Sequence, residues 1–248
     1  MSTSADLYDE FAPYYGEYAH QRDGYLKTLD DIIINFIESQ RRSTTLDIRS
    51  VSMLDVGAGD GKRAFSIANK LNFKKLTLLD SSPEMIKLCK SISDSQVILG
   101  DISTNNFFLK RENYQIITCL WNVLGHIDTP EKRLLGLKNI YKLTSPGGFI
   151  FLDVNNRYNI KNYGVKNVLR NLLKDIFCPS SDNGDINFVI KIKSKEIFAQ
   201  VHIFNPYEIE SLIRRSGLKL VKKYRIDYST GKVSKFFLTG QLFYILSK

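Results

Sequence analysis

The feature that most constrains this chain is a glycine-rich loop between a short apolar run and a stretch with helical spacing. The apolar run covers residues 53–56, and Gly57, Gly59 and Gly61 follow it. Residues 62–71 then repeat apolar side chains at the spacing of a helix. Glycines allow the backbone to turn sharply and to approach a ligand closely. A strand, a glycine loop and a helix in this order predict the first unit of a nucleotide-type binding site.

The residues around this loop argue against a ligand that contains phosphate. A dinucleotide fingerprint that starts at Gly57 needs a glycine at position 62, and a phosphate-binding loop needs Ser or Thr at position 63. The chain has Lys62 and Arg63 at these positions. Asp55 and Asp60 would also repel a pyrophosphate. The sequence therefore predicts a nucleoside-like ligand that lacks phosphates and can carry positive charge.

Residues 54–61 resemble the first motif of class I S-adenosylmethionine-dependent methyltransferases, in which an acidic residue ends the first strand and a Gly-x-Gly-x-Gly loop follows. A glycine-rich turn in another α/β protein is the alternative. The resemblance implies a doubly wound, mostly parallel seven-stranded α/β sheet. It also implies S-adenosylmethionine, which has no phosphate, as cofactor and S-adenosylhomocysteine as product. The residues of the first motif that it places at the cofactor are Asp55, Gly57, Ala58, Gly59 and Gly61.

The ends of the next two predicted strands match the same family. The resemblance implies that the Asp80 carboxylate accepts the ribose hydroxyls, while Ser81 and Met85 flank the adenine. It also implies that Asp101 accepts the adenine amino group and that the backbone of Ile102 binds a ring nitrogen. The alternatives are that Asp80 only caps a helix and that Asp101 lies in a surface turn.

Two further segments are expected to complete the site. The apolar run 114–120 brings Leu120 to the cofactor and leads to His126 at the same sheet edge. His126 is the candidate general base because an imidazole titrates near neutrality, and a structural histidine is the alternative. The aromatic residues of 7–22 resemble an N-terminal lid in which Tyr15 contacts the cofactor. Alternatively, these aromatic residues only pack a helix onto the core.

The motif of amino-directed nucleobase methyltransferases does not follow the fourth predicted strand, where an Asn or Asp, two prolines and an aromatic residue would hold a flipped base. Asn205, Pro206 and Tyr207 occur much later in the chain. With Asn205 as the cap, Pro206 in the first turn and Glu208 reaching back, they predict the start of a helix.

The chain is expected to form one domain over 1–248, because 248 residues with 43% hydrophobic content can build one sizeable core. Its expected parts are a lid and helix (1–45), a cofactor-binding core (46–155), a substrate cap (156–204) and a closing helix with strands (205–248). The apolar side chains of the cap that we expect to face the sheet edge are Val165, Leu169, Leu172, Phe188 and Ile190.

A small-molecule acceptor is the predicted partner. The net charge of +9 suggests nucleic acid, but lysines are spread along the whole chain, which weakens that inference. An RNA methyltransferase is therefore the alternative, and its candidate phosphate contacts are Lys191, Lys193, Lys195, Arg214 and Arg215. A non-catalytic protein that binds S-adenosylmethionine is a second alternative.

The remaining features predict a cytoplasmic protein. The N-terminus lacks the pattern of a secretory signal, and no apolar run approaches the ~20 residues that span a bilayer, so no membrane partner is expected. The cysteines are far apart and are read as reduced thiols: Cys89, Cys119 and Cys178. The histidines are equally scattered, so no metal site is expected: His20, His126 and His202.

Overall fold

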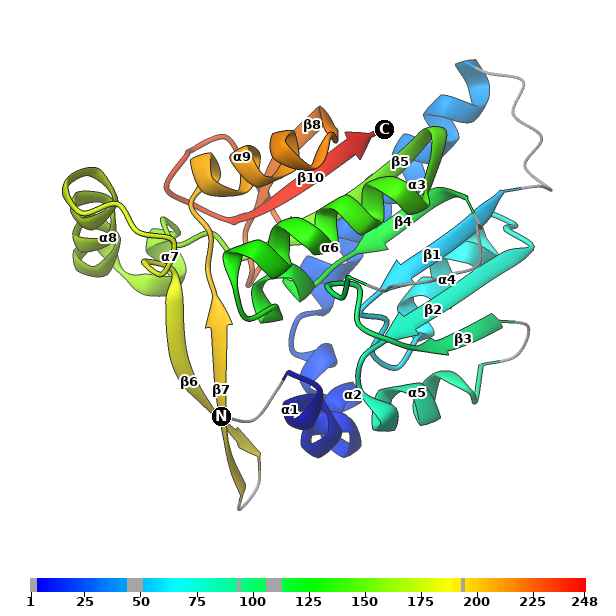
Figure 1. Cartoon of the computed structure of the whole chain (residues 1–248), viewed down its shortest axis with the longest axis horizontal. Helices are drawn as coiled ribbons and strands as arrows, with labels where there is room; N and C mark the ends of the chain where they lie inside the picture. The colour runs from blue at the N-terminus through cyan, green and yellow to red at the C-terminus, as the bar shows by residue number, and fades with distance from the viewer. Residues whose placement is uncertain (1–3, 44–50, 93–94, 106–112, 193–194) are drawn as a thin grey trace.

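A twisted eight-stranded sheet forms the centre of the computed structural model, which describes residues 4–43, 51–92, 95–105, 113–192 and 195–248 (Figure 1). The strand order is β3-β2-β1-β4-β5-β10-β8-β9. The strands are β1 (Ser52–Val56), β2 (Lys75–Asp80), β3 (Ser95–Leu99), β4 (Tyr114–Cys119), β5 (Thr144–Val154), β8 (Lys219–Ile226), β9 (Val233–Ser234) and β10 (Gln241–Ser247).

Most neighbouring strands of the sheet are parallel. Strands β3, β2, β1, β4 and β5 pair in parallel, and β10 pairs antiparallel with both β5 and β8. The two-residue strand β9 is added at the edge beyond β8. The predicted seven-stranded, mostly parallel α/β sheet is therefore confirmed, with β9 as a short addition.

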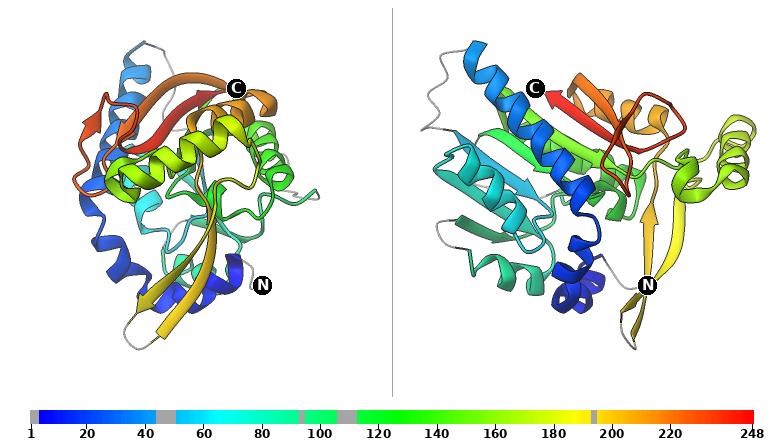
Figure 2. Two further views of the ribbon diagram at one scale, coloured as in Figure 1. Left: turned by 90° about the vertical axis from the view of Figure 1, so that its left-hand side faces the viewer. Right: turned by 180° about the vertical axis from the view of Figure 1, so that it is seen from behind.

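Helices cover both faces of this sheet (Figures 1 and 2). Helices α3 (Asp23–Ser43) and α4 (Lys62–Lys70) lie on one face, and α6 (Pro130–Leu143) and α9 (Pro206–Ser216) lie on the other. Successive side chains of a strand point to opposite faces, so Met53 packs under α3 and α4 while Leu54 packs under α6 and α9. Both faces are buried, which explains why β1 reads as a continuous apolar run.

The N-terminal helices lie across the edge of the sheet where the parallel strands end (Figure 1). They are α1 (Ser4–Phe11), the 3₁₀ turn η1 (Ala12–Tyr14) and α2 (Tyr15–His20). Asp9 attaches α1 to the start of α5 (Pro83–Cys89), where it accepts hydrogen bonds from the Ser82 hydroxyl and the Glu84 backbone N–H. The segment between α5 and β4 contains the Asp101 turn described below.

The insertion after β5 consists of two helices and a hairpin: α7 (Ile160–Tyr163), α8 (Val165–Phe177), β6 (Asp185–Ile192) and β7 (Lys195–His202). The expectation that the apolar side chains of α8 face the sheet edge is wrong for Val165 and Leu169, which are 67% and 54% exposed, whereas Leu172 is half-buried. The hairpin faces the site instead, with Phe188 half-buried against α1. The side chain of Ile190 lies outside the described residues.

A buried group of charged side chains connects this insertion to the core. The ring nitrogens of His202 lie 2.7 Å from Asp185 and 2.7 Å from Glu208. Arg157 is 1% exposed, and its guanidinium lies 2.5 Å from Glu208 and 3.3 Å from Asp175. We call these five residues the buried charge network. Its opposite charges lie close together, which offsets the cost of removing them from water.

Helix α9 begins where the sequence predicted it, with the predicted cap residue. Asn205 caps the helix by accepting a hydrogen bond from the Glu208 backbone N–H at 2.8 Å, and Pro206 occupies the first turn. The Glu208 side chain does not reach back to the cap as expected. It binds Arg157 and His202, because these two side chains lie buried beside it. The motif at Asn205 is therefore a helix start.

Candidate active site

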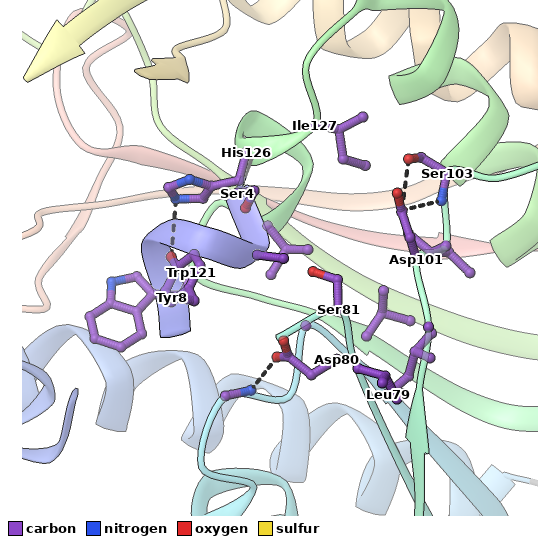
Figure 3. A pocket seen from close by; sticks show the side chains of 18 of the residues that line it. Ser4, Tyr8, Leu79, Asp80, Ser81, Asp101, Ser103, Trp121, His126 and Ile127 are labelled. Carbon is purple, nitrogen blue, oxygen red and sulfur yellow. Dashed lines mark hydrogen bonds between the residues drawn. The ribbon is translucent and has the colours of Figure 1, made fainter. Parts of the chain in front are cut away.

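A cavity of about 410 Å³ lies at the carboxyl ends of β1, β2 and β4. This volume falls in the range of small-ligand pockets. Figure 3 shows Asp80, Asp101 and His126 around one space, each from a different segment. The predicted site residues that line it are Tyr15, Gly57, Gly59, Asp80, Ser81, Asp101, Ile102, Leu120 and His126. We call this space the nucleoside cavity.

The glycine loop forms the floor of the nucleoside cavity because two of its residues leave no room for a side chain. A Cβ atom at Gly57 would lie 2.4 Å from Val123, and one at Gly59 would lie 2.5 Å from the hydroxyl of Tyr15. Both residues also have positive φ angles, +69° and +57°. These positions therefore need glycine for both space and conformation.

Asp80 connects the glycine loop to the second strand end. Its Oδ2 accepts a hydrogen bond from the Gly59 backbone N–H at 2.8 Å, and its Oδ1 accepts one from the Ser82 backbone N–H at 2.9 Å. Burial raises the pKa of Asp80, and these backbone donors oppose that rise. A carboxylate can accept about four hydrogen bonds, so Asp80 keeps capacity for hydroxyl donors in the cavity.

Asp101 forms a tight turn at the end of the third unit, opposite Asp80 (Figure 3). One of its oxygens accepts hydrogen bonds from the Ser103 backbone at 2.8 Å and from the Ser103 hydroxyl at 2.7 Å. Ile102 is buried and provides an apolar wall beside it. Asp101 therefore lies in a surface turn and also lines the nucleoside cavity.

Two predicted cofactor residues do not reach any cavity described for the site, and both belong to the packing beneath it. Met85 is fully buried against Phe11 and Ala12, because α1 lies over the start of α5. Gly61 begins α4, and a Cβ atom there would lie 2.7 Å from Leu78. Both residues therefore take part in packing, and their expected contacts with the cofactor stay predictions.

A second cavity of about 70 Å³ adjoins the first and contains the remaining predicted residues, Asp55 and Ala58. Tyr15 and Gly57 line both spaces. Burial raises the pKa of Asp55 to about 6, although the Thr118 hydroxyl donates a hydrogen bond to it at 2.6 Å. We call this space the amino-acid cavity.

Arg63 also lines the amino-acid cavity, and the sequence analysis did not assign it to the site. Its Nε donates to Asp30 at 2.7 Å, while its Nη2 is buried without a hydrogen-bond partner among the described residues. A buried unpaired guanidinium N–H is costly, so it favours a ligand carboxylate. Asp55 and Arg63 together suit the ammonium and carboxylate of an amino acid. The sequence feature that could have indicated Arg63 is its place as a basic residue in the first helical turn after the third glycine.

A third cavity of about 200 Å³ lies on the other side of the N-terminal helices, beneath the hairpin β6–β7. Tyr8, Tyr15, Trp121 and His126 line both this space and the nucleoside cavity. The two spaces therefore meet at these four side chains. We call the third space the acceptor cavity.

Trp121 lies at this junction on a strained backbone and is held there by hydrogen bonds. Trp121 and Asn122 have φ angles of +67° and +59°, which residues other than glycine seldom adopt. Asp153 accepts a hydrogen bond from the Trp121 backbone N–H, and Tyr228 accepts one from the indole N–H at 2.9 Å. Strain of this kind persists where the surroundings impose it, often at functional sites. Trp121 lies between Leu120 and His126, the two residues predicted for this segment, and was not itself predicted.

His126 lies between the cavities, and its titration differs from the prediction. Its Nε2 is 3.2 Å from the Tyr8 hydroxyl, and its Nδ1 is buried without a partner among the described residues. Burial lowers the pKa of His126 to about 4. The expectation that this imidazole titrates near neutrality is therefore wrong, because the apolar surroundings disfavour the charged ring.

The raised pKa of Asp55 leads to a testable expectation. Near pH 6 about half of the free protein carries a protonated Asp55, and an arriving ammonium favours the carboxylate. Binding of S-adenosylhomocysteine should therefore release a fraction of a proton at pH 6 and almost none at pH 7.5. Calorimetric titration in two buffers with different ionisation enthalpies measures this release. Asp55→Asn should abolish it, and equal release by parent and variant would contradict the assignment.

The comparisons with known proteins agree with this geometry. The family model described as a methyltransferase domain matches residues 54–150. A relative named ubiquinone biosynthesis O-methyltransferase, mitochondrial, from Candida albicans is 29% identical over 126 residues, which are 48% of this chain and 37% of the relative. This chain thus matches little more than a third of the length of that curated relative.

Two solved structures share the fold over nearly the whole chain. The CcbJ methyltransferase from Streptomyces caelestis has a TM-score of 0.68 and 13% identity, with 99% of both chains covered. CalS10 from Micromonospora echinaspora, solved with S-adenosylmethionine bound, has a TM-score of 0.61 and 14% identity, with 94% of this chain and 96% of that chain covered. The family model thus matches 97 of the 248 residues, and the solved structures show that this chain shares the fold of S-adenosylmethionine-dependent methyltransferases.

Proposed function

We propose that this protein transfers the methyl group of S-adenosylmethionine to an uncharged small molecule about the size of one substituted ring. The observation that carries the proposal is the junction of the nucleoside and acceptor cavities at Tyr8, Tyr15, Trp121 and His126. Methyl transfer needs two reactants held end to end in a space from which water is excluded. The two adjoining cavities can hold the two reactants end to end.

The residues present fit the cofactor. Asp80 and Asp101 provide acceptors for hydroxyl and amino groups, and the buried unpaired Nη2 of Arg63 provides a donor for a carboxylate. Asp55 provides a counter-charge for an ammonium. When bound, S-adenosylmethionine supplies a methyl group activated by its positively charged sulfur. The protein therefore needs mainly to orient the acceptor and to shield it from water.

The acceptor cavity favours an uncharged molecule. The described residues that line it carry no formal charge at neutral pH, since His126 stays neutral and burial raises the pKa of Tyr228 to about 12. A charged acceptor would lose its hydration there without gaining a partner. Aromatic faces and the side-chain amides of Asn155 and Asn162 line the space instead. A volume of about 200 Å³ is somewhat larger than the ~150 Å³ cavity that holds a benzene molecule.

The names of two similar proteins support a small acceptor. The Candida albicans relative is named as an O-methyltransferase of ubiquinone biosynthesis, and CalS10 is described as an amino pentose methyltransferase. The lysines considered for RNA do not decide the matter, because Lys193 and the side chains of Lys191 and Lys195 lie outside the described residues.

Radiolabelled methyl transfer to a panel of acceptors tests the proposal. We expect turnover with single-ring phenols or neutral ring amines, and none with ring carboxylates of the same size. Phe188→Trp should fill part of the acceptor cavity and raise KM for the acceptor, while the affinity for S-adenosylhomocysteine stays within threefold. Turnover on RNA alone would replace this proposal by the RNA alternative. Cofactor binding without any turnover would favour the non-catalytic alternative.

We further propose that His126 takes a proton from the acceptor. If Nε2 donates its hydrogen to the Tyr8 oxygen, the unpartnered Nδ1 has a free lone pair, as a base requires. For an acceptor that reacts with loss of a proton, His126→Ala should lower kcat by about 100-fold or more. The affinity for S-adenosylhomocysteine should stay within threefold.

The pH profile distinguishes this role from packing. Because the pKa of His126 is about 4, the parent should lose activity through this residue only as the pH falls toward 4, and not between pH 6 and pH 8. Tyr8→Phe retains the ring packed against His126 but removes the hydroxyl that orients it, so we expect a smaller loss of kcat than for His126→Ala. Equal kcat values for the parent and His126→Ala would return His126 to a structural role.

A further inference from the structure

Helix α8 has an exposed apolar face that the fold leaves without a partner among the described residues. It extends from the body of the molecule at the end away from β3 (Figure 1 and the right-hand view of Figure 2). Val165, Leu169 and Leu173 are four residues apart and form one exposed row. Ile176 and Phe177 extend this surface and are 67% and 75% exposed. The solvent side of α8 is therefore its apolar side.

A row of positive charge borders this apolar row. Lys166, Arg170 and Lys174 each follow a position of the apolar row by one residue, so the two rows lie side by side along the helix. All three side chains are exposed. The outward surface of α8 thus combines apolar side chains with cations.

The acidic side chain of α8 points away from this surface. Asp175 accepts hydrogen bonds from Tyr158 at 2.6 Å and from Asn205 at 3.1 Å, and it pairs with Arg157 in the buried charge network. Val168 lies on the same inward side and is buried. The network therefore sets the rotation of the helix, and with it the direction in which the apolar row faces. The exposure of that row is built into the fold.

We infer that α8 is the contact of this protein with an anionic lipid surface. A convex amphipathic helix with cations beside its apolar face suits the plane of a membrane interface, where apolar side chains enter the headgroup boundary and cations meet lipid phosphates. A second copy of this chain is disfavoured, because pairing would bring the same cations together in a chain with a net charge of +9.

The contact would be peripheral. In the described part of the chain, no helix has both the length and the apolar character that crossing a bilayer requires. The absence of a spanning run, on which the expectation of no membrane partner depends, does not bear on a helix that lies on the surface. The inference does not depend on methyl transfer, because binding to lipid can be measured without turnover.

Co-flotation with lipid vesicles tests the inference. The parent protein should float with vesicles of equal parts phosphatidylglycerol and phosphatidylcholine, and much less with phosphatidylcholine alone. The triple variant Lys166→Gln, Arg170→Gln, Lys174→Gln should weaken partition to anionic vesicles by roughly a hundredfold, from about 1 kcal/mol for each cation. The double variant Leu169→Gln, Ile176→Gln should weaken it by at least about tenfold.

Matched variants control for charge and polarity elsewhere. Lys74→Gln, Lys75→Gln, Lys90→Gln removes three exposed cations away from α8, and Leu220→Gln, Val221→Gln changes two exposed apolar residues of β8. Both controls should float as the parent does. Calorimetry with S-adenosylhomocysteine shows whether each variant is folded.

Several results would overturn the inference. One is a parent protein that does not float with anionic vesicles. Another is equal loss of binding in the α8 variants and their matched controls. Binding that depends on the cations but not on Leu169 and Ile176 would indicate general electrostatic attraction. Sedimentation that shows self-association lost in the Leu169→Gln, Ile176→Gln variant would assign the surface to a second copy.

Discussion

Replacing Asp80 with alanine should weaken binding of S-adenosylhomocysteine by about a hundredfold or more, because hydrogen bonds to a charged group contribute about 1.5–3 kcal/mol each. The variant removes an acceptor for the ribose hydroxyls. It also leaves the backbone N–H groups of Gly59 and Ser82 without the carboxylate that they bind at 2.8 Å and 2.9 Å. The glycine loop then loses its side-chain connection to β2, while the backbone hydrogen bonds from Gly57 and Ala58 to the Leu79 carbonyl remain.

Asp101→Ala is the matched control for this experiment. Asp101 is exposed, and its described hydrogen bonds organise only the local turn at Ser103. We expect it to weaken binding by about tenfold or less. Calorimetric titration compares both variants with the parent. If Asp80→Ala binds within threefold of the parent, Asp80 does not hold the cofactor.

Replacing Arg157 with methionine should lower the free energy of unfolding by about 3–5 kcal/mol, as expected when one partner of a buried ion pair is removed. Arg157 is 1% exposed, and both Glu208 and Asp175 would lose the cation that they contact. Methionine retains much of the volume of the side chain, so the loss measures mainly the unpaired charges. Urea unfolding followed by circular dichroism gives this difference.

The pair between Lys223 and Glu210 provides the comparison. Its atoms lie 2.7 Å apart, but both side chains are about one-third exposed, at 30% and 31%. Lys223→Met should therefore change the unfolding free energy by less than about 1 kcal/mol. A loss of that small size for Arg157→Met would show that the buried charge network does not stabilise the insertion.

The local sequence determined the strand, glycine loop and helix on which the site is built. The spacing of the motif indicated that glycine was needed at Gly57 and Gly59, where the φ angles are positive. The close neighbours that also exclude a side chain there, Val123 and Tyr15, come from distant segments. Asp80 and Asp101 could be located because parallel strands end at one edge of a sheet. The periodicity of apolar residues and the spacing of the glycines and acidic residues are local properties of the sequence. The core of the fold could therefore be predicted from them.

Only the tertiary structure decided which side chains face the ligand. Met85 has the right position in sequence, but the packing of α1 against α5 buries it beneath the site. Arg63 follows the glycine loop and became a candidate only when its Nη2 proved buried and unpartnered beside Asp55. The low pKa of His126 also depends on burial by segments far away in the chain. Such desolvation depends on every neighbour in space, and the sequence motif does not contain it.

The orientation of α8 shows the same division. Its sequence determined that the helix would have one apolar face and one row of cations, since both follow from helical periodicity. It did not determine which way the apolar face would point. Asp175 decided that. Its bonds to Arg157, Tyr158 and Asn205 turn the side of the helix that carries Asp175 inward and leave Leu169 and Ile176 exposed to solvent. A periodic pattern defines the faces of a helix, while buried charges elsewhere in the fold select the face that packs inward.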